Sequence, residues 1–165
     1  MTDFAKDLLV WFQEHGRKGL PWQSSPPDIY HVWLSEIMLQ QTQVATVVNY
    51  FNNFIVSFPT VAELATADEE EVLSSWAGLG YYSRARNLHK SAKIILSKYQ
   101  GIFPTSYSEL IVLPGIGEST AGAILSLACS QSQPILDGNV KRVLSRYYRV
   151  AGHYSESKVL KELWR

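Results

Sequence analysis

The chain has 165 residues, no net charge at neutral pH, 46% apolar residues and 18% charged residues. This length can bury one sizeable core and favours a single domain or one large fragment, while the composition excludes a disordered chain. No run of about 18 apolar residues is present, which argues against a membrane span. The N-terminal letters MTDFAKDLLVWF lack the layout of a secretory signal.

Charge is distributed unevenly along the chain. Residues 1–80 hold three Lys or Arg against ten Asp or Glu, whereas residues 81–165 hold twelve against five. A neutral protein of this kind can still present a basic face to a polyanion such as DNA. Basic residues scattered over solvated helix faces would give the same balance, so charge alone leaves both interpretations open.

Helical spacing of apolar residues dominates the chain, and alternating apolar and polar runs are nearly absent, so an all-α fold is expected. The expected helices cover residues 3–16, 29–42, 45–57, 83–98 and 121–129. Shorter helices are expected after the capping-box patterns Thr60-x-x-Glu63, Asp68-x-x-Glu71 and Ser106-x-x-Glu109. Residues 17–28 contain three prolines and are expected to form a loop.

A glycine-rich segment, LPGIGESTA at residues 113–121, separates two helical patterns. Gly115 and Gly117 favour a tight turn with positive φ angles. The amides of this turn and of the following helix can point at one anion, such as a DNA phosphate. A plain turn is the alternative, but the full pattern resembles the helix–hairpin–helix element of DNA repair glycosylases, which contacts the DNA backbone.

Two carboxylates are candidates for catalysis. Glu36 lies in an otherwise apolar helix with Gln40 on the same face, and burial would raise its pKa and make it a usable general acid. A Glu paired with a nearby Arg or Lys is the alternative. Asp137 precedes Gly138 and is expected at a helix N-terminus, where a carboxylate stays ionised. The alternative role of Asp137 is a plain N-cap. Asn139 would orient Asp137 or the sugar; its alternative role is to cap the first turn of the helix.

Four strings decide between these interpretations: LPW at 20–22, WLSEIMLQQTQV at 33–44, GLGYYSRARNLHK at 78–90 and PILDGNVKRVL at 134–144. Together they resemble MutY-type adenine DNA glycosylases of the helix–hairpin–helix superfamily over essentially the whole chain. The resemblance implies base-excision removal of adenine opposite 8-oxoguanine or guanine in double-stranded DNA. It implies that Glu36 protonates the adenine and that Asp137 stabilises the oxocarbenium-like sugar, two carboxylates flanking the scissile bond.

The same resemblance implies which residues contact and distort the DNA duplex. Gln41 and Tyr81 would wedge into the base stack, Tyr81 beside the oxidised guanine, and Leu39 would help fill the distorted stack. Packing roles for Leu39 and Tyr81, and a surface role for Gln41, are the alternatives. Further candidate DNA contacts, each also explicable without DNA, are Gln40, Arg84, Arg86, His89, Gly115, Gly117, Lys141 and Arg142.

An endonuclease III-like pyrimidine glycosylase with lyase activity is the alternative within the superfamily. Lyase chemistry needs an amine nucleophile, which those relatives carry just after the hairpin glycines. This sequence has Ser119 there, with Lys141 as the nearby amine along the chain. A monofunctional adenine glycosylase is therefore the better interpretation.

The family pattern also includes four cysteines that bind a [4Fe-4S] cluster, and a later domain that recognises oxidised guanine. The single Cys129 matches none of these ligands and is expected to be buried and unreactive, in a reducing, cytoplasmic setting on a bacterial nucleoid. We therefore expect a chain truncated before the cluster loop. Residues of about 20–132 would form a six-helix barrel, and residues 1–19 and 133–165 an incomplete second domain. A non-catalytic DNA-binding fragment is the alternative function, and the first helix is expected to leave apolar surface exposed.

Overall fold

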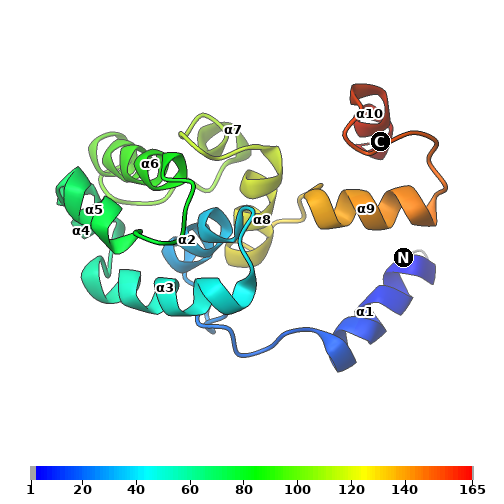
Figure 1. The fold of residues 1–165 in the computed structure, drawn as a ribbon, viewed down its shortest axis with the longest axis horizontal. Coiled ribbons are helices and arrows are strands. Elements are labelled where there is room, and N and C mark those ends of the chain that lie inside the picture. Colours follow the sequence, from blue (N-terminus) through cyan, green and yellow to red (C-terminus); the bar gives the residue numbers. More distant parts are fainter. Residues whose placement is uncertain (1–2, 165) are drawn as a thin grey trace.

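A computed structural model describes residues 3–164, and every regular element among them is a helix (Figure 1). The helices are α1 (Asp3–His15), α2 (Ile29–Leu39), α3 (Val44–Ser57), α4 (Val61–Thr66), α5 (Glu69–Ser75), α6 (Ser83–Tyr99), α7 (Tyr107–Leu110), α8 (Glu118–Ala128), α9 (Gly138–Tyr147) and α10 (Ser157–Leu163). The predicted all-α class is confirmed. Within the described part of the chain, no helix has the length and apolarity needed to cross a membrane.

Helix α2 lies at the centre of the molecule. It contacts α3, α6 and α8, while α4 and α5 pack against α6 and α7 packs against α8. The helix begins where it does because the Asp28 carboxylate caps it, accepting hydrogen bonds from the backbone N–H groups of Tyr30 (2.8 Å) and His31 (3.1 Å). Its buried residues are Tyr30, Val32, Trp33, Leu34, Ser35, Ile37 and Met38.

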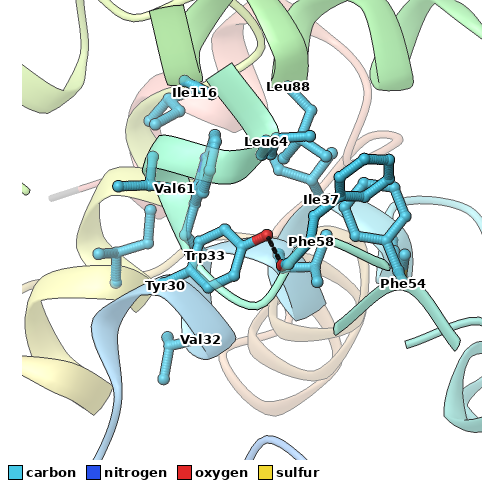
Figure 2. Packing of buried hydrophobic residues seen from close by; sticks show 14 of the residues in the cluster. Tyr30, Val32, Trp33, Ile37, Phe54, Phe58, Val61, Leu64, Leu88 and Ile116 are labelled. Atoms are coloured by element: carbon cyan, nitrogen blue, oxygen red, sulfur yellow. Dashed lines mark hydrogen bonds between the residues drawn. The ribbon is translucent and has the colours of Figure 1, made fainter. Parts of the chain in front are cut away.

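The core around α2 is rich in aromatic side chains (Figure 2). Trp33 is fully buried, and its ring lies 5.1 Å from that of Phe103 in an edge-on arrangement. The Tyr30 hydroxyl donates a 2.7 Å hydrogen bond to the backbone carbonyl of Phe58, a bond drawn in Figure 2. This bond satisfies a buried polar group and ties the start of α2 to the end of α3.

Three helices lie apart from this packed group: α1, α9 and α10 (Figure 1). Neither α1 nor α9 contains a buried residue. The five consecutive apolar residues of α1 from Leu8 to Phe12 are each between 49% and 58% exposed, as expected for the first helix. The Phe4 and Tyr147 rings, 4.3 Å apart, join α1 to α9.

The end of α2, the start of α8 at Glu118 instead of residue 121, and the capping of α7 differ most from the sequence-based predictions. Helix α2 ends at Leu39, three residues early, because Gln40 leaves the helical conformation and Gln41 is left-handed with φ 58°. At α7 the Ser106 hydroxyl donates to the Glu109 carboxylate, and no side chain caps the backbone N–H groups. The predicted box at α4 does form its first bond, since Thr60 Oγ1 accepts from the Glu63 N–H at 3.2 Å.

Candidate active site

A cleft of about 1310 Å³ brings together both carboxylates that the sequence singled out. Glu36 reaches the cleft from α2, and Asp137 reaches it from the segment that joins α8 to α9. Other predicted site residues that line the cleft are Leu39, Gln40, Gln41, Ser119 and Asn139. Two acids that share one cleft are the groups needed to act on both partners of a glycosidic bond.

Glu36 lies in a desolvated position, between the buried residues Ser35 and Ile37. Burial, and to a smaller extent the negative charge of Asp137, raises the pKa of Glu36 from 4.5 to about 7. The two ion pairs of the described residues, Glu14–His15 and Glu69–Arg86, do not involve Glu36. The alternative of a Glu neutralised by a neighbouring cation therefore has no support in the geometry.

Asp137 occupies the N-cap of α9 and remains exposed to the cleft. Its Oδ1 accepts a 2.7 Å hydrogen bond from the backbone N–H of Val140. This bond satisfies one of the free N–H groups in the first turn of α9 and fixes the orientation of the carboxylate. Asn139 does not bond to Asp137; its amide oxygen accepts a 3.2 Å hydrogen bond from the Arg142 guanidinium instead.

The segment that carries Asp137, residues 133–137, is attached to one face of α8. The Ser119 hydroxyl accepts a 3.1 Å hydrogen bond from the Leu136 N–H, immediately before Asp137. The Ser126 hydroxyl bonds to both the N–H and the carbonyl of Gln133. Between them, a Cβ at Gly122 would lie only 2.5 Å from the Pro134 carbonyl oxygen, so this close approach requires glycine. Helix α8 thus sets the position of Asp137.

The hairpin between α7 and α8 has one left-handed glycine, at Gly115 (φ 81°). The Ser91 hydroxyl donates to the Pro114 carbonyl at 2.8 Å and fixes the turn against α6. The prediction of a positive φ at Gly117 is wrong: its φ is −93° and its ψ is 178°, because it is the extended N-cap of α8. A Cβ at Gly117 would meet open space, and no side chain caps the α8 amides.

Two predicted DNA contacts on α6 are corrected by the structure. His89 is 2% exposed, and burial lowers its pKa, so it forms part of the interior rather than a phosphate site. Arg84 is 8% exposed, and its guanidinium is occupied by backbone carbonyls. Arg86 does reach the surface, where its Nε lies 3.4 Å from the Glu69 carboxylate.

A smaller pocket of about 240 Å³ adjoins the hairpin. The predicted wedge residues Gln41 and Tyr81 line it together with Gly115, and Tyr81 is 59% exposed. Sequence reasoning missed Asn87 here and Arg17, which lines the larger cleft. It also missed Gly122, although small residues at positions 119, 122 and 126 share one helical face and signal a close approach.

The residues of this chain do not fit an iron–sulfur cluster. Such a cluster takes four cysteine ligands, and the sequence contains only Cys129. Among the described residues, no group of three or more His, Cys, Asp or Glu side chains is placed to hold a metal ion. Cys129 is half-buried at the end of α8, and burial raises the pKa of its thiol, as expected for an unreactive cysteine.

Residues 34–165 match the family model of the HhH-GPD superfamily base excision DNA repair proteins. The chain therefore belongs to this superfamily, as its hairpin and carboxylates suggested. It is similar to the adenine DNA glycosylase of Buchnera aphidicola subsp. Acyrthosiphon pisum, with 53% identity over 98% of this chain and 46% of that protein. The human adenine DNA glycosylase is 42% identical over 99% of this chain and 31% of its own length. These matches confirm the resemblance found in the sequence, and the chain spans about half or less of these relatives.

Solved structures give the same architecture. A thermostable thymine-DNA glycosylase superposes with a TM-score of 0.85 at 26% identity, covering 98% of this chain and 73% of that one. An endonuclease III in a non-covalent complex with DNA superposes with a TM-score of 0.79 at 22% identity, covering 99% and 76%. The predicted fold of this glycosylase superfamily is therefore confirmed.

Proposed function

We propose that the protein removes adenine opposite 8-oxoguanine or guanine from double-stranded DNA, by hydrolysing the N-glycosidic bond. The observation that carries this proposal is that Glu36 and Asp137 line the same cleft and interact electrostatically, with the pKa of Glu36 raised to about 7. The similarity to adenine DNA glycosylases over almost the whole chain supports adenine as the base. The substrate places the protein on the chromosome.

In this proposal Glu36 acts as the general acid. Because its pKa is about 7, a substantial fraction is protonated at neutral pH, which an ordinary Glu would not be. The acid transfers its proton to the adenine, the bond between base and sugar breaks, and its electron pair leaves with the base. Protonation lowers the barrier because neutral adenine is a better leaving group than its anion.

Asp137 acts on the other partner of the broken bond. As the base departs, positive charge develops on the sugar, and an ionised carboxylate in the cleft stabilises that charge. Its attachment to α8 through the Leu136 N–H holds it in place before the charge forms. Water completes the hydrolysis by adding its oxygen to the sugar carbon and loses one proton, which Asp137 or the solvent accepts; Glu36 is left ionised until it recovers a proton from the solvent.

DNA binding is assigned to the hairpin and to the two exposed residues beside it. Uncapped amides at the start of α8, next to Gly115 and Gly117, suit a backbone phosphate. Gln41 and Tyr81 would enter the base stack and support the hole that the extruded adenine leaves. Leu39, Gln40, Arg86 and Lys141 remain proposed contacts around this surface, and residues of about 20–132 are proposed as one domain, with residues 1–19 and 133–165 in a second.

Single-turnover release of adenine from a duplex with adenine opposite 8-oxoguanine tests the proposal. The parent protein should release adenine, and Glu36→Gln should slow release by about 10²- to 10⁴-fold, the usual contribution of a general acid, with little change in DNA binding. Asp137→Asn should slow it by on the order of 10³-fold because the developing charge loses its partner. Release at equal rates by the parent and both variants would refute the assignment.

Two alternative functions have distinct outcomes in the same assay. Salt-sensitive binding of the duplex by the parent, without adenine release, would favour a non-catalytic DNA-binding fragment, an alternative suggested by the partial coverage of the relatives. Release of a pyrimidine with strand cleavage would favour an endonuclease III-like lyase. The Ser119 hydroxyl, which accepts from the Leu136 N–H, offers no amine for that chemistry.

A further inference from the structure

The buried guanidinium of Arg84 closes the C-terminal end of α2. Its Nη1 donates hydrogen bonds to the carbonyl oxygens of Ile37 (3.1 Å), Met38 (2.7 Å) and Gln40. These carbonyls belong to the last turn of α2 and lack partners further along the helix. The cation also lies at the negative end of the helix dipole, which favours it there.

The same guanidinium holds a second segment, the turn that precedes α6. Its Nη2 lies 3.4 Å from the carbonyl oxygen of Leu79 and 3.3 Å from that of Gly80, and 3.2 Å from the Thr42 hydroxyl. The guanidinium carbon is 5.3 Å from the centre of the Tyr81 ring and 5.5 Å from that of Trp76. One side chain therefore joins two segments that are distant in sequence.

Each segment carries a non-glycine residue in the left-handed conformation. Gln41 has φ 58° and Tyr81 has φ 50°, and both are exposed. Such backbone positions are unfavourable for residues other than glycine, and they persist only where surrounding contacts hold them. Arg84 supplies those contacts, because it bonds to the residues on both sides of Gln41 and to the residue before Tyr81.

We infer that Arg84 is a positioning residue that holds Gln41 and Tyr81 at a fixed spacing, so that they meet the duplex as one rigid pair. This inference rests on the proposed function. Both residues line the pocket of about 240 Å³ beside Gly115, and Arg84 forms part of its wall. A pair that is already ordered loses less conformational freedom when DNA binds, so binding to a distorted site becomes stronger. Arg84 itself makes no phosphate contact in this scheme.

Arg84→Lys tests the inference because lysine keeps the charge but replaces the planar, five-donor guanidinium by one ammonium with three donors, which is too few to reproduce the bonds to α2 and to the turn. Amide hydrogen exchange of the free protein gives the first measurement. The hydrogen-bonded amides of Thr42 and Leu79 report on the two segments. Both should exchange faster in the variant, while amides in α3 and α8 keep the parent rates. Faster exchange in only one segment, or in neither, would overturn the inference.

Binding of two duplexes gives the second measurement. Arg84→Lys should weaken binding to the duplex with adenine opposite 8-oxoguanine by about tenfold, roughly one hydrogen bond to a charged group, and leave a fully paired duplex unaffected. If Arg84→Met instead weakens the binding of both duplexes equally, and the slope of log binding constant against log salt concentration falls by about one, Arg84 contacts a phosphate. That result would overturn the inference. Lys90→Met, which removes an exposed charge from the same helix, is the control.

A double variant separates positioning from general destabilisation. In a Tyr81→Ala background Arg84→Lys should lose most of its effect on duplex discrimination, because one member of the pair is already gone. A full additional effect would overturn the inference. If the parent fails to release adenine, the proposed function fails, and the exchange measurement on the free protein still decides whether Arg84 couples the two segments.

Discussion

The two walls of the cleft present the same chemical group in opposite settings. Glu36 projects from α2, where seven of eleven residues are buried, whereas Asp137 precedes α9, which has no buried residue. Burial shifts the pKa of Glu36 upward and makes it an acid, whereas Asp137 is exposed and is held by a hydrogen bond from the backbone N–H of Val140. Packing around α2 therefore controls the protonation of Glu36, whereas the few hydrogen bonds to residues 133–137 control the position of Asp137.

Removing a large buried side chain from α2 gives the largest expected effect, a loss of stability. Trp33→Ala should lower the free energy of unfolding by about 3–5 kcal/mol, because it leaves a cavity beside Tyr30 and Phe103. Urea unfolding followed by circular dichroism measures this. Trp33→Phe is the control and should cost much less, since the indole N–H has no hydrogen-bond partner among the described residues. A small loss of unfolding free energy in Trp33→Ala would contradict the description of α2 as tightly packed in the core.

The raised pKa of Glu36 predicts a pH-dependent gain of stability when the acid is removed. Since the pKa is about 7 in the folded protein and 4.5 ordinarily, the contribution of Glu36 to stability is largest below pH 4.5 and is lost as the pH rises through 7. Glu36→Gln should therefore be more stable than the parent at pH 8.5 by up to about 3 kcal/mol, relative to their difference at pH 4.

Urea unfolding at both pH values measures that difference, with Glu70→Gln as a control at an exposed position. If the difference in unfolding free energy between Glu36→Gln and the parent is the same at the two pH values, Glu36 is not desolvated. The adenine-release rate of the parent should also fall above pH 7, as the acid form of Glu36 is lost.

Displacing the segment of residues 133–137, which carries Asp137, from α8 should affect the rate of adenine release more than the stability of the protein. Gly122→Ala places a methyl group against the Pro134 carbonyl and displaces the segment before Asp137. We expect adenine release to slow by up to about 10²-fold, with a cost of about 1–3 kcal/mol in stability. The decline of rate with pH should move to lower pH, because Asp137 helps to raise the pKa of Glu36.

Rate against pH under single-turnover conditions measures this shift. Gly138→Ala, whose Cβ meets open space, is the control for stability. Loss of stability in Gly122→Ala without any change of the pH profile would show that α8 does not position Asp137.

The smallest expected effect comes from a single hydrogen bond to the same segment. Ser119→Ala removes the acceptor for the Leu136 N–H and should slow adenine release by about fivefold, equivalent to about 1 kcal/mol. Thermal unfolding should change by a comparably small amount. An unchanged rate would mean that Gly122 and Ser126 hold the segment without Ser119.

Several features were predictable because they depend on local spacing. Periodic apolar residues indicated helices over most of α2, α3 and α6, and Asp137 followed by glycine indicated a helix N-terminus. The end of α2 was not predictable, since the letters QQT after Leu39 favour continuing the helix. The partner of the Gln40 carbonyl at this helix end is Arg84, far along the chain, and the letters around Gln40 do not reveal it.

The sequence by itself determined the all-α class, the hairpin and the two carboxylates, because periodicity, glycine placement and motif identity are written in neighbouring residues. The tertiary structure decided that Glu36 is desolvated, that Arg84 is buried between two segments, and that Gly122 holds the segment before Asp137. Burial and hydrogen-bond partners depend on which helices pack together, and a charged residue on a helix gives no local sign of whether it will face solvent or carbonyl oxygens.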